Sequence, residues 1–336
     1  MDILTDNNSP HGSKHIAAAL QEVVNEIQVV PSNQHFIEAN TVSATFNELK
    51  KGHIIPVFIK DNEPVISHTE FIQTTIKAVK AVFPTETVLS PVIRISHPVK
   101  GRVPEAKDKP AKALKEHEKT IYYERMAFTV EIPTITTEVD GCKLNLTVGG
   151  IKAYNLDNLY NKSTSDQHFK VFIGFKNMVC TNLCVATDGY LSNLRVNNVN
   201  QLYNGIFMLL KDYDAVELSR LYGLFSKYSI SERQFANLVG RCRMYRHMPE
   251  KKKKELPDLM FGDSQINTVC KDYYSDNSFC SSPDGSINLW KLYNLFTNAN
   301  KSSYVDYFMD RNVNAFELVS QLQHALDSSD DCWYLN

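Results

Sequence analysis

The stretch IYYERMAFTVEIPTITTEVDGCKLNLTVGGIKAY, residues 121–154, decides the fold expected for this chain. Within it, residues 126–132 alternate in the pattern of a strand with one buried face. The buried face is expected to carry Met126, Phe128, Val130 and Ile132, and the other face Ala127, Thr129 and Glu131. Residues 139–141, Val-Asp-Gly, are typical of a tight turn, so residues 121–133 and 142–154 are expected to form a β-hairpin.

Two further stretches rich in β-branched and aromatic residues extend this hairpin into a sheet. They are TVLSPVIRIS at 87–96 and FKVFIGFKNMVCTNLCV at 169–185. The segments between the strands lack room for regular crossover helices, which predicts a mostly antiparallel sheet. Gly149 and Gly150 lie inside the third strand and indicate a β-bulge there.

Helical periodicity is seen on both sides of the sheet. Before it, the spacing predicts one helix after Ser13, an extended piece at 54–59, and a second helix that begins at Thr69 and stops at Pro84. After residue 190 helices are expected at the capping boxes Asp214–Glu217 and Ser229–Glu232, at the cap Ser286, and over roughly 303–326. The predicted class is α+β: a short N-terminal helical region at 1–85, a central mostly antiparallel β-sheet at 86–190, and a helical C-terminal half at 191–336, which together can form one compact unit.

Composition indicates a soluble protein without a general affinity for polyanions. The 336 residues are 43% hydrophobic and 22% charged, with a net charge of −2, so any nucleic-acid binding must come from a local patch. No signal peptide or membrane-spanning run is apparent, which predicts a cytoplasmic protein without a membrane partner. In that compartment the seven cysteines are expected to stay reduced.

Cys180 and Cys184 are the residues that first suggest chemistry. On a strand two thiols four residues apart lie about 13 Å apart, too far to share a metal ion except across a tight turn. The chain has no convincing second pair of ligands, so buried unreactive thiols are favoured over a metal site or a nucleophile, and neither a metal nor a cofactor is predicted. His97 and His168 flank predicted strands and are the histidines with which a catalytic role would most readily be associated.

Other signatures of chemistry are missing or weak. The sequence has no GxxxxGK[ST] phosphate-binding loop, no GxGxxG after a strand and no HExxH. Asp263, Asp272 and Asp276 leave open a two-metal nuclease, but scattered aspartates in polar segments are more typical of soluble surface. Asn182 is a polar residue within an apolar run. A buried side-chain amide needs hydrogen-bond partners, so Asn182 is expected either to fix a neighbouring loop or to face a site.

The segment GRCRMYRHMPEKKKK, residues 240–254, is the clearest basic run in the chain. A basic helix that leads into a lysine run is typical of contact with a phosphate backbone, although a solvated helix end has the same appearance. The predicted contact residues are Arg241, Arg243, Tyr245, Arg246, Lys251, Lys252, Lys253 and Lys254. The connection 97–120 carries more basic than acidic residues, and we expect an exposed arm there that contributes Lys100 and Arg102 or is simply a solvated insertion.

Two motifs resemble a broad group of uncharacterised bacterial proteins, often described as phage- or plasmid-like and carried on mobile elements. The first is Val179-Cys180-Thr181-Asn182, and the second runs from Trp290 to Thr297 and includes Asn294. The resemblance covers about half of the chain and implies work on DNA without implying a mechanism. It also suggests that Asn182 and Asn294 meet near one site between the sheet and the C-terminal helices.

The leading interpretation is a non-enzymatic, nucleic-acid-associated protein of a mobile element, with single- or double-stranded DNA as its partner. The alternative is a protein–protein interaction or inhibitor module, for which a protein partner would be expected. A second alternative is an uncharacterised enzyme that uses Cys180 or an aspartate cluster.

Overall fold

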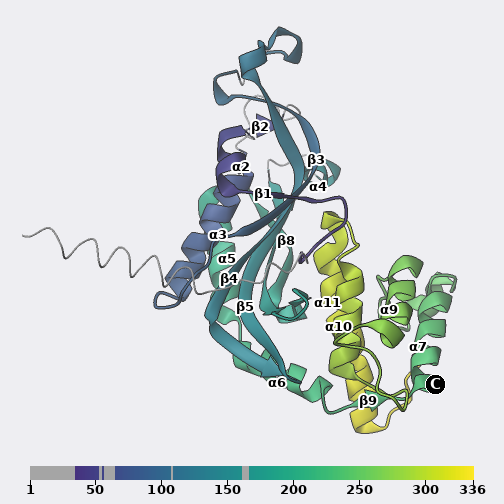
Figure 1. The fold of residues 1–336 in the computed structure, drawn as a ribbon. Helices are drawn as coiled ribbons and strands as arrows, with labels where there is room; N and C mark the ends of the chain where they lie inside the picture. Colours follow the sequence, from purple (N-terminus) through teal and green to yellow (C-terminus); the bar gives the residue numbers. More distant parts are fainter. Residues whose placement is uncertain (1–34, 53–54, 57–64, 107–108, 161–165) are drawn as a thin grey trace, which may run out of the picture. The chain divides into compact units, whose positions relative to one another are not determined.

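The computed structural model describes residues 35–52, 55–56, 65–106, 109–160 and 166–336. The predicted helix after Ser13 and most of the predicted extended piece at 54–59 lie outside these residues. Residues 36–336 pack into one unit, in which a curled antiparallel sheet is combined with C-terminal helices (Figure 1). The α+β class is therefore confirmed.

An eight-stranded sheet forms the centre of the described residues, and every pairing in it is antiparallel, as expected. Its order is β1-β3-β4-β5-β6-β7, with β2 also pairing with β3, and β8 with β6. The strands are β1 Val42–Ala44, β2 Ile55–Pro56, β3 Val92–Arg102, β4 Lys119–Val139, β5 Cys142–Ala153, β6 Gln167–Asn177, β7 Leu183–Cys184 and β8 Tyr190–Val196. A second, two-stranded sheet pairs β9 Ser229–Ile230 with β10 Ile287–Asn288.

The predicted hairpin joins β4 to β5. Asp140 and Gly141 have φ values of 51° and 73°, so both central residues are left-handed, as a type I′ turn requires. The register between these strands shifts between Ile132 and Thr136. Pro133 lies in this interval and has no N–H to donate to the ladder, which explains the irregularity.

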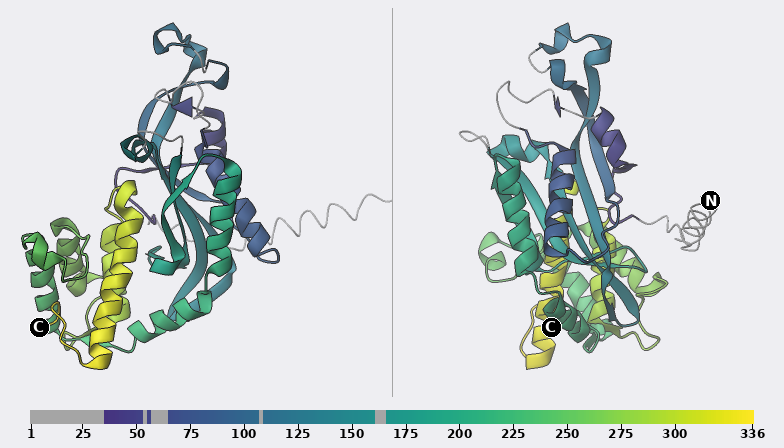
Figure 2. Two further views of the ribbon diagram at one scale, coloured as in Figure 1. Left: turned by 180° about the vertical axis from the view of Figure 1, so that it is seen from behind. Right: turned by 90° about the vertical axis from the view of Figure 1, so that its left-hand side faces the viewer.

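Both faces of the sheet are buried, whereas the alternation predicted only one. Helices α3 His68–Val82 and α5 Val199–Asp212 cover the apolar face that carries Phe128. Helix α11 Val305–Ser328 covers the other face, where Ala127 and Thr129 are only 1% and 3% exposed (Figure 2). The prediction of a solvated second face was wrong because a helix far along the chain packs against it.

The bulge predicted at Gly149 and Gly150 is also wrong, because strand pairing is regular through both residues. A Cβ atom at Gly149 would lie 2.3 Å from the Phe128 carbonyl oxygen, and one at Gly150 would lie 2.2 Å from Cζ of Phe71. The two glycines therefore make room for neighbouring aromatic rings.

The predicted helices within the described residues are found in the expected order, with some shifted starts. The remaining helices are α2 Phe46–Gly52, α4 Tyr154–Tyr160, α6 Ala215–Phe225, α7 Glu232–Tyr245, α8 Glu250–Lys253, α9 Asp263–Ser275 and α10 Leu289–Asn300. The structure thus adds α2, α4, α5, α8 and α9, which were not predicted. Asp214 caps α6 as expected, but α7 is capped by Ser231 and α10 by Asn288. These two starts move because residues 229–230 and 287–288 pair with each other before the helices begin.

Both ends of the connection predicted as an exposed arm at 97–120 belong to strands of the sheet. Strand β3 continues to Arg102 and β4 begins at Lys119, so that only residues 103–118 connect them, through three short 3-10 turns (Figure 1). Arg102 is 9% exposed and donates to the Lys109 carbonyl oxygen, while Lys109 pairs with Glu118. These contacts give the tip of the hairpin a folded structure.

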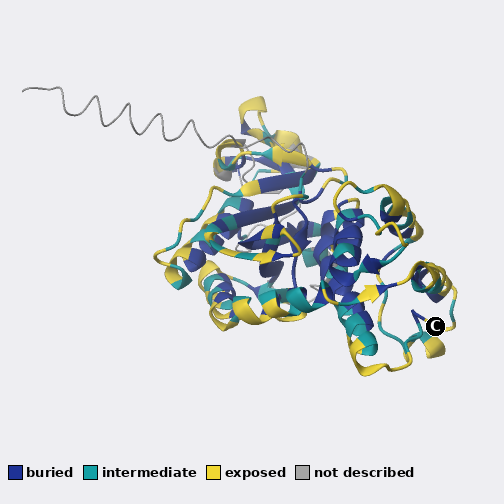
Figure 3. Cartoon of the chain, turned by 60° about the horizontal axis from the view of Figure 1, so that its bottom comes forward, coloured by how far each residue is buried: buried dark blue, intermediate teal, exposed yellow. Residues whose placement is uncertain are grey.

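Burial is concentrated in the sheet and in the helices that pack on it (Figure 3). Within the described residues, no helix combines the length and the apolar character needed to cross a membrane.

Candidate functional site

The basic run at 240–254 folds into the end of α7, a turn, and α8. Its exposed members are Arg243, Arg246, Lys251, Lys252 and Lys254, which we call the basic surface. Lys253 is half-buried, with its ammonium 5.8 Å from the centre of the Tyr245 ring, and this contact holds α8 against α7. Tyr245 itself is 7% exposed, so its predicted role as a contact residue is replaced by a packing role.

Several of these cations already have partners. Arg246 pairs with Asp263 at 3.0 Å, Lys253 pairs with Glu250 at 2.8 Å, and Arg243 donates to the Asn267 side chain. Arg241 lies over the Trp333 ring at 4.9 Å and donates to the Asn336 carbonyl oxygen at 2.8 Å. Solvent-exposed ion pairs of this kind contribute little and exchange readily for other partners.

Three lysines remain uncommitted. Lys251, Lys252 and Lys254 are exposed and make no hydrogen bond or ion pair within the described part of the chain. Their charge is therefore available to an anionic partner.

The two basic segments that the sequence suggested do not form one surface. The β3–β4 tip and α7 lie at opposite ends of the unit (Figures 1 and 2). At the tip, Lys109 pairs with Glu118 and Lys119 pairs with Glu116. Arg102 is buried, and the Lys100 side chain is outside the part of the chain that the structure describes.

Asn182 and Asn294 do meet. Nδ2 of Asn182 donates to the carbonyl oxygen of Asn294 at 3.0 Å and lies 3.4 Å from its Oδ1. Nδ2 of Asn177, the last residue of β6, donates to the same Oδ1 at 3.2 Å. Asn182 is 1% exposed and the other two are fully buried, so the trio fastens the β6–β7 turn to α10 inside the protein.

The thiols in this turn are poor nucleophiles. Burial raises the pKa of Cys180 to about 12 and that of Cys184 well above its ordinary value. Thr181 between them has a φ of 61°, and Lys301 closes the turn by donating to the Cys180 carbonyl oxygen and, at 3.2 Å, to the Thr181 hydroxyl. Among the described residues no three His, Cys, Asp or Glu side chains are grouped to hold a metal ion.

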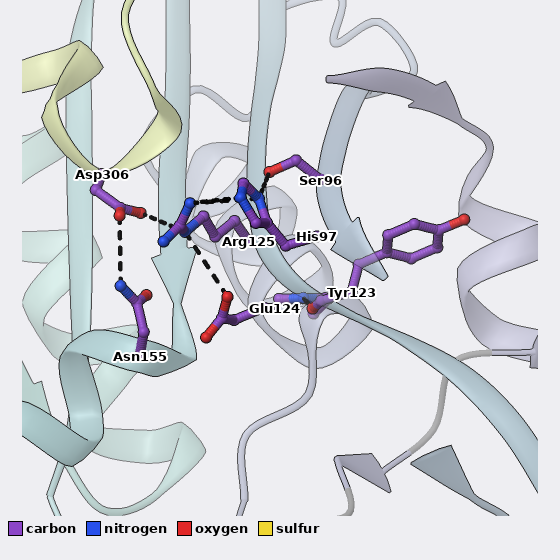
Figure 4. Close-up of polar contacts among 8 residues, drawn as sticks. Ser96, His97, Tyr123, Glu124, Arg125, Asn155 and Asp306 are labelled. Atoms are coloured by element: carbon purple, nitrogen blue, oxygen red, sulfur yellow. Dashed lines mark hydrogen bonds and ion pairs between the residues drawn. The ribbon is translucent and has the colours of Figure 1, made fainter. Parts of the chain in front are cut away.

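A polar centre that the sequence did not predict lies where α11 meets the sheet (Figure 4). Nε of Arg125 on β4 is 3.1 Å from Oδ1 of Asp306, in the first turn of α11, and 3.9 Å from Glu124. Asn155 on α4 donates to Oδ2 of Asp306 at 3.4 Å. Nη1 of Arg125 lies 3.0 Å from Nε2 of His97.

His97 has the geometry of an anchored ring rather than of a catalytic base. Its Nδ1 is 2.9 Å from the hydroxyl of Ser96, but the ring faces the Arg125 guanidinium and not a carboxylate that would orient it for proton transfer. Ser96 is 4% exposed. His97 also has a φ of 59°, which is unusual for a side-chain-bearing residue in a strand. His168 is likewise held, with Nε2 2.9 Å from the Ser192 carbonyl oxygen.

A second set of contacts continues the polar centre along α11. Lys170 on β6 donates to the Asp306 carbonyl oxygen at 2.7 Å and pairs with Asp310 at 2.5 Å. Tyr190 donates to the other carboxylate oxygen of Asp310 at 2.6 Å. The first two turns of α11 are thus tied to β4 and β6 by ion pairs and to β8 by the Tyr190 hydroxyl.

Comparison with known protein families gives a match. Residues 17–335 match the family described as "Domain of unknown function, B. Theta Gene description (DUF3871)". The chain belongs to the DUF3871 family. No curated protein and no solved structure matches it.

The DUF3871 match supports the resemblance to an uncharacterised family and carries no activity with it. In this DUF3871 chain the basic surface was visible in the sequence because its residues are nearly consecutive. The Arg125 centre was not, because its members come from β3, β4, α4 and α11. Two features of the sequence could have indicated this centre. Charged residues such as Arg125 and Lys170 lie within predicted strands, and Asp306 and Asp310 are one helical turn apart.

Proposed function

We propose that this DUF3871 protein is a nucleic-acid-binding protein that contacts the phosphate backbone through the basic surface on α7 and α8. The observation that carries the proposal is the set of three exposed, uncommitted lysines, Lys251, Lys252 and Lys254, beside Arg243 and Arg246. Phosphate contacts by such side chains release counterions and supply affinity independent of sequence. A local surface of this kind acts even though the net charge of the chain is −2.

A binding role fits the chain better than catalysis. The thiol pKa values of Cys180 and Cys184 are raised by burial, and His97 faces a guanidinium instead of an orienting acid. The association with mobile elements that the resemblance implies belongs to the same proposal, and recurrent recombination or replication genes beside DUF3871 genes would support it.

The proposal is tested by titrating labelled single- and double-stranded DNA at low and moderate salt. The variant Lys251→Ala/Lys252→Ala/Lys254→Ala removes three positive charges from the basic surface. If each lysine contacts one phosphate of duplex DNA, the slope of log affinity against log salt should fall by about 3. The control Lys50→Ala/Lys51→Ala/Lys211→Ala removes the same charge from exposed positions on α2 and α5, and should change the slope little.

Two results would overturn the proposal. One is the absence of binding to either form of DNA at low salt. The other is an equal loss of affinity in the two triple variants, because that would reflect net charge and not the basic surface.

A further inference from the structure

Two exposed tyrosines lie at the start of α11. Tyr304 immediately precedes the helix and Tyr307 lies in its first turn, and their side chains are 51% and 54% exposed. The Tyr307 N–H donates to the Tyr304 carbonyl oxygen at 3.0 Å, so the two residues belong to the same turn of the chain. Large exposed aromatic side chains placed together in this way offer two ring faces to a ligand.

Arg311 links these tyrosines to the basic surface. Its guanidinium lies 6.0 Å from the centre of the Tyr307 ring, one turn further along α11. Arg311 is held in place by donating to the Met260 carbonyl oxygen at 2.9 Å and to the Ser303 hydroxyl at 2.7 Å.

Arg246 and Arg311 both contact the short segment 260–263. Arg311 donates to the Met260 carbonyl oxygen, a Cβ atom at Gly262 would lie 3.7 Å from Nη1 of Arg246, and Arg246 pairs with Asp263 at 3.0 Å. Cationic side chains therefore continue from α8 through Arg246 and Arg311 to the exposed tyrosines.

Contacts with the sheet and with α4 fix the turn of α11 that carries the tyrosines. Asp306, between Tyr304 and Tyr307 in sequence, is 7% exposed and is held by Arg125 at 3.1 Å and Asn155 at 3.4 Å (Figure 4). Lys170 holds its carbonyl oxygen at 2.7 Å. With Asp306 turned inward and fastened, the rings beside it are presented on an ordered support, which reduces the entropy lost when a ligand binds.

We infer that the ligand of this surface is single-stranded nucleic acid, whose unpaired bases stack on Tyr304 and Tyr307 while Arg246, Arg311 and the α8 lysines hold its phosphates. This inference rests on the proposed function and specifies its substrate class. Duplex bases are already stacked and paired, so they offer no free face to the tyrosines, whereas aromatic platforms beside basic grooves are how proteins hold single strands.

The test is fluorescence anisotropy with a labelled oligothymidine and with a duplex of the same length. Tyr304→Ala/Tyr307→Ala should weaken binding of the single strand about tenfold or more, since stacking contributes on the order of 1–3 kcal/mol per base. Tyr304→Phe/Tyr307→Phe keeps the aromatic rings and should bind nearly as well as the unmodified chain. Duplex binding should change little in either variant.

Tyr274→Ala is the matched control. Tyr274 is 69% exposed on α9, and its hydroxyl donates to Glu232, the first residue of α7. The basic surface begins at the other end of α7, about 20 Å away along a helix of this length. Loss of this tyrosine should therefore leave oligothymidine binding unchanged.

The outcomes separate the two proposals. If neither form of DNA binds at low salt, the proposed function fails. If both forms bind, the lysine variant weakens them, and the two tyrosine-to-alanine changes have no effect, then nucleic-acid binding stands and the stacking inference is overturned. An equal loss in the phenylalanine and alanine variants would also overturn it, because stacking does not need the hydroxyl groups.

Discussion

At the scale of single residues, Lys152 combines a lysine side chain with complete burial. Its side chain is fully buried, with Nζ 2.7 Å from Asp157, 3.1 Å from the His168 carbonyl oxygen and 4.2 Å from the centre of the Phe169 ring. Burial lowers the pKa of Lys152 from 10.5 to about 8, although Asp157 opposes the change. Between these two pH values the unfolded chain binds the proton more tightly than the folded chain.

The sign of the pH dependence follows from this difference. The stability contributed by uncharged Lys152 is complete above the unfolded pKa of 10.5 and is lost as the pH falls through about 8. Raising the pH from about 7.5 to about 9.5 should thus increase the free energy of unfolding of the unmodified chain, relative to Lys152→Met, by about 2 kcal/mol. Urea unfolding at the two pH values measures this difference.

Lys211→Met provides the control for this prediction. It makes the same substitution at an exposed position on α5, and its free energy of unfolding should track that of the unmodified chain at both pH values. Parallel pH profiles for the unmodified chain and Lys152→Met would contradict the assignment of the effect to Lys152.

At the scale of elements, the sheet depends on a close fit between β5 and the rings on either side of it. Gly150→Ala would place a methyl group 2.2 Å from Cζ of Phe71 on α3, and should reduce the free energy of unfolding by about 1–3 kcal/mol through overpacking. Gly240→Ala makes the same change on α7, where no atom beyond the adjacent residues and the local backbone of the helix lies within 4 Å of the new methyl group. Better helix propensity should then increase stability by about 0.5–1 kcal/mol. Denaturant midpoints that move in the same direction for both variants would show that packing at Gly150 is not the cause.

Local pattern was enough to predict the long strands β3, β4, β5 and β6 and five of the helices, because each of these carries its own period, but α5 and α9 were not predicted. The hairpin at Asp140–Gly141 and the helix start at Asp214 depend on neighbours within a few residues, and both are found. The starts of α7 and α10 were displaced by two residues because β9 and β10 are defined by pairing across more than fifty residues. The glycine pair was misread for the same reason, since Phe71 and Phe172 come from other elements.

At the scale of the whole molecule, the candidate sites differ in how far they can be predicted. The lysines of the basic surface are nearly consecutive in sequence, so the basic surface can be located without knowledge of the fold. Tyr307 and Arg311 are four residues apart on α11, so their contact is local, whereas the tertiary structure brings Arg246 and Arg311 to the same segment 260–263. Arg125 lies in the sheet and Asp306 in the last helix of the chain, so no periodicity relates them.

The Arg125–Asp306 pair joins the sheet to the start of α11, and its energetic coupling can be measured directly. The side chains are 17% and 9% exposed, and removing one partner leaves the other charge largely buried. Arg125→Met and Asp306→Asn should each reduce the free energy of unfolding by about 3 kcal/mol, while the double variant should cost clearly less than their sum. The same cycle on Lys253 and Glu250, where the glutamate is 80% exposed, should give a coupling below about 0.5 kcal/mol. Additive losses at Arg125 and Asp306 would mean that the helix is held to the sheet by its apolar contacts alone.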